Sequence, residues 1–434
     1  MKRLTAALLL LVLPTAVASA GESIYLDAAT ETAKWIRSSA VKTEKGLVWP
    51  ADPADSKSIN TTLYSGTPGV VLFFIEASRA TSDRSYLADA RAGADYLMAS
   101  VINEKDNGLY TGLAGIGFTL SEVYRATGDA RYREGALRCA ELIRSRAVKA
   151  GSGVEWSDTT DIISGSAGTA LFLLYAAREF KKPEFRETAR LAGARLIELA
   201  REETNGLKWA MTPRFPRLMP NFSHGTAGIA YFLATLYEET KEKTFLDAAL
   251  AGAKYLLSVA KTDGDVCMIF HNEPDGRELF YLGWCHGPAG TARLFYRLHK
   301  ATGDRQWMEW VKRSARAVLQ SGIPEKQTAG FWNNVSRCCG AAGVADFFLD
   351  LYQATGDREY LDFCKRVAAQ VLSLAARDQK GARWIQAEHR VRPELLVAQT
   401  GLMQGASGMG MLMIRLYDFE RGKKPSLRLP DTPF

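Results

Sequence analysis

The sequence has 434 residues, of which 47% are hydrophobic, and a formal net charge of +7 at pH 7. Its basic residues form no Lys/Arg-rich run and no nucleic-acid fold signature, so we do not expect nucleic acid as a partner. No linker, low-complexity tract or charge block marks a boundary between domains. The length exceeds that of a usual single core, which favours an architecture that grows by adding units.

Residues 1–20 have the three parts of a secretory signal. Lys2-Arg3 precedes an apolar run over 4–17, and residues 18–20 form an A-x-A-like cleavage site. The run is short for a membrane span and contains Pro14. We therefore predict a signal peptide over 1–20, one folded domain over 21–434, and export to the periplasm or the medium. We expect no stable membrane insertion after cleavage, and an uncleaved anchor is the alternative.

A Gly-x-x-Gly pattern then occurs seven times, each time at the start of an apolar stretch. The glycine pairs are Gly66/Gly69, Gly112/Gly115, Gly165/Gly168, Gly225/Gly228, Gly287/Gly290, Gly340/Gly343 and Gly405/Gly408. Fifteen residues after the first glycine, four copies reach the same turn, which reads Thr81-Ser82-Asp83, Thr127-Gly128-Asp129, Thr302-Gly303-Asp304 and Thr355-Gly356-Asp357. A second pattern with apolar and Ala positions on one helix face follows each break. The unit is therefore a helical hairpin of about 50 residues.

The two helices of a unit differ in composition. Helices that open with Gly-x-x-Gly are apolar nearly all round, as in 169–175, and should be buried on every side. The second helices carry a charged face, as in 186–190, and should lie outside. These features predict an all-α fold, an α/α toroid of seven helical hairpins in two concentric rings. The seventh glycine unit lacks a second helix and the N-terminal helix lacks a first, so 22–40 should pack beside 405–420.

Three cysteines lie one or two residues before a Gly-x-x-Gly, namely Cys285, Cys338 and Cys339. A helix N-terminus carries partial positive charge and lowers the pKa of a thiol toward the thiolate that zinc binds. We therefore predict a metal site whose sulfurs lie within about 4 Å of one another, as tetrahedral ligation at a Zn–S distance of about 2.3 Å requires. The alternative is a disulfide, from Cys285 to either of the others or between the adjacent pair, because export leads to oxidising conditions.

The remaining three cysteines argue against pairing of all six, and two of them are expected to be buried structural residues. Cys139 and Cys364 occupy apolar positions of outer helices, and Cys267 lies in a loop.

His224 stands out among the histidines, because it directly precedes the fourth glycine unit. Cys339 and His286 precede their own units at the same offset, so all three should line one end of the toroid. A helix-capping or core histidine is the alternative for His224. The other histidines are expected at the surface, and they are His271, His299 and His389.

At these residues the chain resembles the lanthionine synthetase C family, the cyclases of thioether-containing peptides and their eukaryotic LanC-like relatives. The resemblance covers essentially residues 21–434. In that family a seven-hairpin toroid holds zinc through a Trp-Cys-x-Gly element and a later Cys-His-Gly element. Here Trp284-Cys285-His286-Gly287 matches the first element, and Arg337-Cys338-Cys339-Gly340 matches the second with Cys in place of His, as in some lanthionine synthetases.

The resemblance implies one zinc ion per chain, held by Cys285, Cys338 and Cys339, with His286 as the alternative third ligand. Three thiolates and an open position suit a catalytic zinc. The resemblance also makes His224 the general acid or base that handles the proton during thiol addition.

Asp161 would be the carboxylate that orients the His224 imidazole. A plain helix-start or solvated loop residue is the alternative for Asp161. His286 and Trp284, on either side of the first cysteine, are assigned to substrate binding. The family's basic residue shortly before that cysteine is missing, and Arg277 is only a loose substitute.

The implied function is zinc-dependent addition of a thiol to a dehydroamino acid, which forms a thioether as in lanthionine-type cyclisation. The partner would be a peptide or a small thiol such as glutathione. One alternative is a protein that keeps the metal and binds a thiol or peptide without turnover. Another is a glycosidase, which needs two carboxylates, for which Asp158, Asp161 and Glu388 are candidates, but it leaves the three thiols unexplained.

Overall fold

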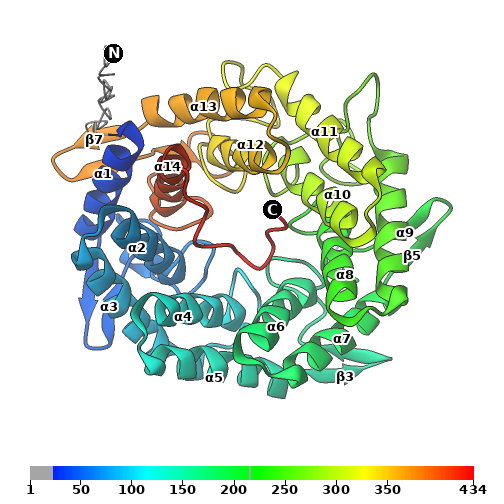
Figure 1. Cartoon of the computed structure of the whole chain (residues 1–434), viewed down its shortest axis with the longest axis horizontal. Helices are drawn as coiled ribbons and strands as arrows, with labels where there is room; N and C mark the ends of the chain where they lie inside the picture. The colour runs from blue at the N-terminus through cyan, green and yellow to red at the C-terminus, as the bar shows by residue number, and fades with distance from the viewer. Residues whose placement is uncertain (1–22, 215–216) are drawn as a thin grey trace, which may run out of the picture.

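The computed structural model describes residues 23–214 and 217–434, and within them the chain forms a ring of helical hairpins (Figure 1). Seven helices line the inside and seven lie outside them, so the predicted α/α toroid with two concentric rings is confirmed. The predicted signal peptide lies outside the described residues and stays a prediction, as does its cleavage. In the described part of the chain, no helix combines the length and hydrophobicity needed to cross a membrane.

Each inner helix has 15 residues and begins directly after the first glycine of a Gly-x-x-Gly pair. The first eleven residues of the sixth inner helix, Ala341–Leu351, are all buried, as a helix packed on every side requires. The inner helices are α2 (Thr67–Thr81), α4 (Leu113–Thr127), α6 (Ser166–Phe180), α8 (Thr226–Thr240), α10 (Pro288–Thr302), α12 (Ala341–Thr355) and α14 (Ala406–Glu420).

Each outer helix buries one stripe against the inner ring, as Tyr132, Ala136, Cys139 and Ile143 do at helical spacing. The predicted turns join the two rings. Gly128 ends α4 with a backbone in the left-handed region, and the side chain of Asp129 caps the next helix by accepting from the N–H of Arg131. The outer helices are α1 (Ile24–Ser38), α3 (Arg84–Ser100), α5 (Ala130–Arg146), α7 (Pro183–Glu198), α9 (Lys243–Val259), α11 (Arg305–Leu319) and α13 (Arg358–Ser373).

The two ends of the helical chain close the ring. α1 packs against α14, so the N-terminal helix supplies the outer partner that the last inner helix lacks (Figure 1). The pairing of α1 with α14 is the arrangement that the sequence predicted for 22–40 and 405–420.

Short two-stranded ribbons in the outer connections were not expected. Four of them join an outer helix to the next unit: β1 (Val41–Thr43) with β2 (Gly46–Val48), β3 (Val148–Ala150) with β4 (Gly153–Glu155), β5 (Arg201–Glu203) with β6 (Gly206–Lys208), and β7 (Ala376–Asp378) with β8 (Gly381–Arg383). A fifth pairs β9 (Gln386–Ala387) with β10 (Leu396–Val397). Short 3-10 helices cover Ser56–Ser58 and Val101–Asn103. Gly46 has a φ of 135°, which favours glycine, and a Cβ there would strike the carbonyl of Ala92 in the neighbouring outer helix.

The second glycine of each pair makes room for the loop that precedes its own helix. A Cβ on Gly290 would overlap the carbonyl oxygen of Trp284, and one on Gly343 would overlap that of Arg337. The loop therefore folds back onto the first turn of the helix, and only glycine permits this approach. The same contact sets the position of the residues just after Trp284 and Arg337.

A closed ring of backbone hydrogen bonds joins the seven loops before the inner helices. In six of the loops, the residue two positions before the first glycine donates its N–H to the carbonyl of the residue at the same position in the next loop. In the third loop, Ile162 donates in place of Ile163. The donor–acceptor pairs are Tyr64–Tyr110 (3.0 Å), Tyr110–Ile163 (2.9 Å), Ile162–Ser223 (3.3 Å), Ser223–Cys285 (3.0 Å), Cys285–Cys338 (3.2 Å), Cys338–Met403 (2.9 Å) and Met403–Tyr64 (2.9 Å).

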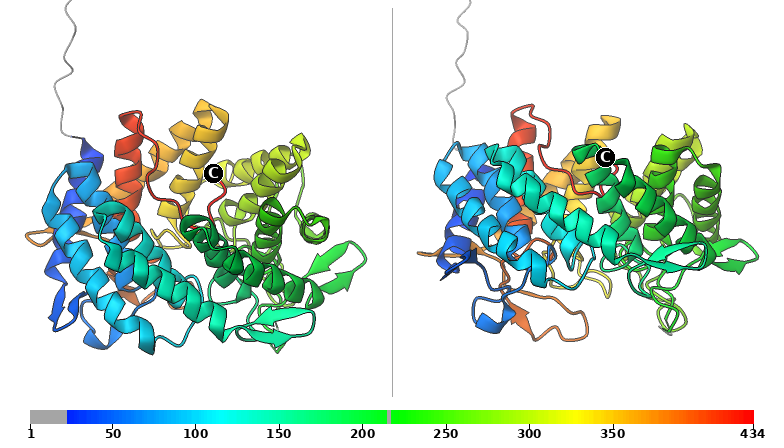
Figure 2. Two further views of the ribbon diagram at one scale, coloured as in Figure 1. Left: turned by 60° about the horizontal axis from the view of Figure 1, so that its bottom comes forward. Right: turned by 90° about the horizontal axis from the view of Figure 1, so that it is seen from below.

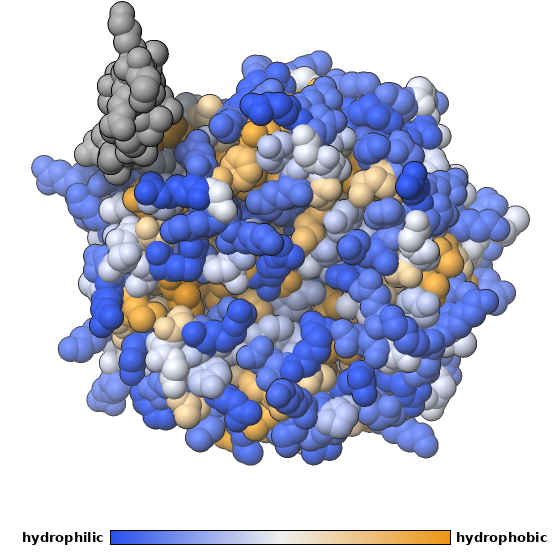
Figure 3. Space-filling view, viewed as in Figure 1, coloured by the Kyte–Doolittle hydropathy of each residue, from blue (hydrophilic) through white to orange (hydrophobic). Residues whose placement is uncertain are grey.

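The residues after α14 run into the middle of the ring (Figure 2). Asp431 is fully buried there and accepts a hydrogen bond from the hydroxyl of Tyr110, while its carbonyl accepts one from Arg293. Phe434 stacks on Tyr296 of α10 with ring centroids 4.3 Å apart. The face of the molecule that is seen in Figure 1 is mainly hydrophilic, with hydrophobic residues in small scattered patches (Figure 3).

Candidate metal centre and active site

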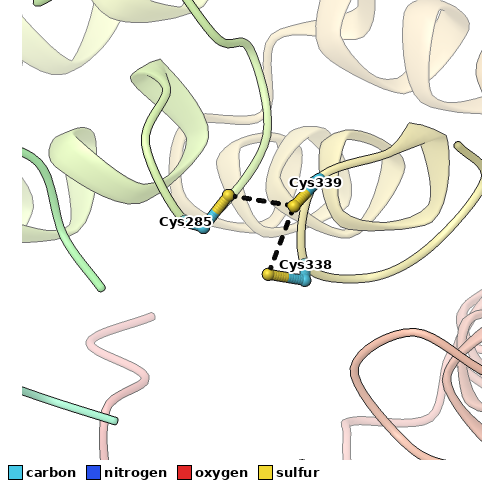
Figure 4. Close-up of side chains that lie close together, drawn as sticks. All are labelled: Cys285, Cys338 and Cys339. Carbon is cyan, nitrogen blue, oxygen red and sulfur yellow. Dashed lines mark hydrogen bonds between the residues drawn. The ribbon is translucent and has the colours of Figure 1, made fainter. Parts of the chain in front are cut away.

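The sulfur atoms of Cys285, Cys338 and Cys339 form one compact cluster (Figure 4). The Sγ of Cys339 lies 3.2 Å from that of Cys285 and 3.5 Å from that of Cys338, and all three lie within 4.8 Å of one another. Three sulfurs bound to one zinc at about 2.3 Å would be roughly 3.8 Å apart. The three sulfurs therefore lie close enough together to be ligands of one metal ion.

The loop ring explains why these residues meet. Cys285 and Cys338 are consecutive members of the ring of hydrogen bonds, with 3.2 Å between the N of Cys285 and the O of Cys338. Cys339 follows directly and its N–H is held by the hydroxyl of Ser336 at 3.2 Å. Two adjacent units thus supply all three thiols at the N-terminal ends of α10 and α12, where helix dipoles favour thiolates.

The three thiols differ in acidity. Donation from Cys285 and Cys339 lowers the pKa of Cys338 well below the usual thiol value, although burial opposes this shift. Burial raises the pKa of Cys285 well above the usual value, as do its bonds to the other two thiols. For Cys339 the bond with Cys285 acts to lower the pKa, but the bond to Cys338 and burial outweigh it and raise the pKa. The hydrogen bonds within the cluster therefore favour a thiolate at Cys338.

The disulfides that the sequence left open are not formed. All six cysteines lie in the described part of the chain, and all six are free. Cys139 and Cys364 are fully buried in outer helices, as predicted for structural cysteines, and Cys267 is also buried. None of these three belongs to the sulfur cluster.

His224 and Asp161 form a direct pair. The Nδ1 of His224 lies 2.5 Å from the Oδ2 of Asp161, and the carboxylate is fully buried. The other oxygen of Asp161 accepts from the N–H groups of Ser164 and Gly165 at the start of α6, so the residue holds a helix start and the imidazole together. Burial opposes protonation of His224, but the bond and charge of Asp161 outweigh it and raise the pKa of His224 above 6.5.

His286 is buried beside His224, with their ring centroids 5.7 Å apart, and does not belong to the sulfur cluster. Its Nδ1 has no hydrogen-bond partner among the described residues. Burial lowers the pKa of His286 well below its usual value, and His271 and His224 add to this effect. The neutral form of the His286 ring is therefore favoured.

His271 corrects the expectation that it lies at the surface away from the site. It is half-buried, and its ring centroid lies 4.3 Å from that of His286 and 4.5 Å from that of Tyr281. These three residues form an aromatic wall. The wall was missed because His271 comes from the long connection after α9, which carries no helical spacing or glycine offset.

Trp284 is buried at the base of the site. Its ring lies 5.3 Å from that of Tyr110 and 5.7 Å from that of Phe222, and only 3% of the residue is exposed. This packing indicates that Trp284 supports the loop of Cys285, and a direct contact with substrate stays a prediction.

Arg390 acts on the wall as a basic group, whereas Arg277 is paired with a carboxylate. Arg277 is exposed and pairs with Glu273 at 2.5 Å. Burial raises the pKa of Tyr281 to about 12, and the nearby Arg390 opposes this rise. Arg390 reaches the wall from the loop between β9 and β10, and its Nε is buried without a hydrogen-bond partner among the described residues.

A shared offset identifies further residues of the site. The seven residues that directly precede the first glycines are all polar: Ser65, Thr111, Ser164, His224, His286, Cys339 and Gln404. Gln404 is 2% exposed and its Nε2 lies 3.9 Å from the Sγ of Cys339. Sequence reasoning used this offset for three of the seven positions and missed Gln404, which the same signal would have found.

Comparison with known proteins identifies the family. The sequence matches the model of the lanthionine synthetase C-like proteins over residues 57–429. Glutathione S-transferase LANCL1 of Danio rerio is 27% identical over 139 residues, which cover 32% of this chain and 32% of that protein, so the match spans about a third of the curated relative.

Two solved structures share the fold. Nisin cyclase has a TM-score of 0.63 at 15% identity, with 91% of this chain and 93% of that chain covered. A variant of the α-1,6-mannanase GH76A of Salegentibacter sp. HEL1_6 has a TM-score of 0.52 at 13% identity, with 91% of this chain and 98% of that chain covered. The toroid is thus of the type seen in these enzymes. The chain belongs to the lanthionine synthetase C-like family.

Proposed function

We propose that this protein is a zinc-dependent enzyme that adds a thiol to a dehydroamino acid and so forms a thioether. The observation that carries the proposal is the convergence of three free thiols beside the loop of His224. The N–H of Ser223 donates to the carbonyl of Cys285 at 3.0 Å, so the acid–base pair and the thiol cluster sit on hydrogen-bonded neighbouring loops.

The donor set supports zinc as the resident metal. Thiolates are soft ligands that favour zinc, and the buried sulfur cluster offers three of them. Cys285, Cys338 and Cys339 would hold the ion and leave a fourth position for substrate. Zinc, when bound, lowers the pKa of a ligand in that position and so supplies a nucleophile at neutral pH.

The protein's own groups would manage the proton. The protonated imidazole of His224 would deliver its proton to the α-carbon of the substrate after the new C–S bond forms at the β-carbon. Asp161 would hold that imidazole in one orientation through the 2.5 Å contact and stabilise its charged form. The aromatic wall of His286, His271 and Tyr281 would confine the dehydroamino acid beside the His224 ring.

The substrate class follows from the same wall and from the relatives. A structure named nisin cyclase supports a peptide acceptor, and a relative named a glutathione S-transferase supports a small thiol donor. Arg390 offers a cation at the wall that would suit a carboxylate of either substrate. We further propose that the protein acts after export, as residues 1–20 predict.

The glycosidase alternative rests on the mannanase fold alone. That enzyme is inactivated by changing two neighbouring aspartates, and this sequence contains no two adjacent aspartates. Asp161 is engaged by His224, and the carboxylate of Glu388 accepts from Gln399 at 2.7 Å. These partners favour structural or acid–base roles over a pair of sugar-cleaving carboxylates.

Two substitutions test the proposal. Cys285→Ala should release zinc and abolish thioether formation, because two remaining thiols hold an open site poorly. His224→Ala should keep the zinc and lower the rate by about a hundred- to ten-thousand-fold, the usual contribution of an acid–base group. Bound zinc and thioether formation on a dehydrated peptide would be measured on the same samples.

The matched control is Cys267→Ala, which removes another buried free thiol outside the cluster and should leave zinc content unchanged. Unchanged zinc in Cys285→Ala would overturn the metal site. Full activity in His224→Ala would remove that residue from the mechanism.

A further inference from the structure

Gln404 lies beside the sulfur cluster. Its loop follows that of Cys338 and Cys339 along the chain, whereas the loop of His286 precedes it. It directly precedes the glycine that caps α14, the unit that follows the one bearing Cys338 and Cys339. Its Nε2 donates to the hydroxyl of Tyr64 at 2.9 Å and lies 3.9 Å from the Sγ of Cys339. Sulfur accepts hydrogen bonds at such longer distances because its radius is large.

The orientation of this amide is fixed by its other partners. The Nδ2 of Asn334 donates to the Oε1 of Gln404 at 3.3 Å and to the carbonyl of Ala387 at 2.9 Å. The Oδ1 of Asn334 accepts from Ser336, so Asn334 can present only its donor side to Gln404. Gln404 must therefore direct its NH2 group at Tyr64 and Cys339.

From this chain of hydrogen bonds we infer that Gln404 is a positioning residue, whose amide donates to the Cys339 thiolate and stabilises the three-thiolate form of the metal site. The inference rests on the proposed metal site. Three thiolates around a divalent ion carry a net charge of −1, and a substrate thiolate would make it −2. A buried donor aimed at one sulfur withdraws part of that charge and holds the ligand in place.

The amide donor of Gln404 is explained by a third ligand that is a cysteine, Cys339. The family usually has His where Cys339 stands, and a neutral imidazole would bring no charge to be offset. A donor at 404 is thus matched to the thiolate at 339. Groups that support metal ligands in this way typically contribute about ten- to a hundredfold to metal affinity.

The test compares zinc affinity, measured by competition with a chelator, in the wild-type protein and in Gln404→Met. Methionine has similar size and no donor, and we expect zinc to bind about ten- to a hundredfold more weakly. Cobalt-substituted protein should show a shifted sulfur-to-metal charge-transfer band, which a change in stability alone would not produce. Gln399→Met in the same segment is the matched control and should leave both readouts unchanged.

A second variant, at Asn334, keeps the inference testable if Gln404→Met folds poorly. Asn334→Asp cannot donate to Oε1, so the amide of Gln404 loses its fixed orientation and zinc affinity should fall in the same direction. In a Cys339→His background the change at 404 should have less than a threefold effect, because no thiolate is left for the donor.

The outcomes separate this inference from the proposed function. A wild-type protein without zinc would sink the metal site itself. A wild-type protein that binds zinc but forms no thioether would sink the enzyme and leave the role of Gln404 standing. Equal zinc affinity and equal cobalt spectra in wild type and Gln404→Met, or an equal loss in the Cys339→His background, would overturn the inference alone.

Discussion

The pair of Asp161 and His224 predicts how the reaction depends on pH. Asp161 raises the pKa of His224 despite its burial, so the acid form persists above the usual value of about 6.5. Asp161→Asn keeps an oxygen for the N–H groups of Ser164 and Gly165 but removes the charge. The pKa of His224 should then fall, because burial lowers it and only the weaker effect of the Cys338 charge still opposes burial, and the alkaline limb of the kcat profile should move to lower pH.

The loss of stability caused by Asp161→Asn should also depend on pH. A histidine whose folded pKa is raised contributes stability fully below its unfolded pKa of about 6.5 and loses it as pH rises through the folded pKa. The drop in melting temperature caused by Asp161→Asn should therefore be larger at pH 6 than at pH 9. Asp158→Asn, exposed in the same loop, is the control. An alkaline limb that stays in place would show that Asp161 does not tune His224.

At the scale of single residues, the sequence predicted a position in the site only for residues at a repeated offset from a glycine pair. The sequence predicted a shared location for Cys285, Cys338, Cys339 and His224 because each stands one or two places before a Gly-x-x-Gly, and the hydrogen bonds between the loops explain why that offset becomes a common location. His271 could not be found in this way. It reaches the site from a long connection whose path depends on packing between distant residues and not on local spacing.

At the scale of the element, the glycine pairs predict a specific effect of added volume. Gly290→Ala places a Cβ against the carbonyl of Trp284, and Gly115→Ala places one against the carbonyl of Leu109 at the same offset of another unit. Both variants should lose about 1–3 kcal/mol of unfolding free energy, the usual result of overpacking. Only Gly290→Ala should also lose zinc, because Trp284 directly precedes Cys285.

Urea unfolding of the metal-free proteins and zinc content of the loaded ones would check this prediction, with Gly115→Ala as the matched control. Equal zinc content in the two variants would show that the helix start does not set the position of Cys285.

The helices were predictable and the ribbons between them were not, for a physical reason. The inner helices combine a fixed start signal with an almost fully apolar face, and both are visible in one sequence. The strands are too short to show a period, and β5 (Arg201–Glu203) is charged and exposed throughout. Their pairing depends on glycines with positive φ, such as Gly206, and on contact with the next outer helix.

At the scale of the whole molecule, the ring was predictable by counting helices, but the path of the C-terminal residues was not. Among the described residues, six of the seven inner helices are followed by an outer helix, so α14 and the N-terminal α1 are left unpaired in sequence, and they pack against each other. The segment after α14 has no helical spacing, and nothing in its composition indicates that Asp431 becomes fully buried in the middle of the ring.

Asp431 connects this segment to the residues beneath the site through an ion pair and a hydrogen bond. The Oδ2 of Asp431 lies 3.7 Å from the Nη1 of Arg293 and accepts from the hydroxyl of Tyr110, whose ring packs on Trp284 beside Cys285. Both charged side chains are almost completely buried, with 0% of Asp431 and 7% of Arg293 exposed. Removing Asp431 would leave the buried Arg293 without its ion-pair partner and with only its longer-range attraction to Asp346, which is more costly than removing both residues.

Asp431→Ala should therefore destabilise the protein by about 3–5 kcal/mol, and the double variant Arg293→Met/Asp431→Leu should recover much of that loss. Urea unfolding of the single and double variants would give the coupling between the two residues, and Glu394→Ala at an exposed position should change stability by no more than about 0.5 kcal/mol. If Asp431→Ala were as mild as the change at Glu394, the C-terminal segment would lie on the ring without stabilising it. If instead the double variant were no more stable than Asp431→Ala, the loss would come from the hydrogen bond of Tyr110 and not from the buried charge of Arg293.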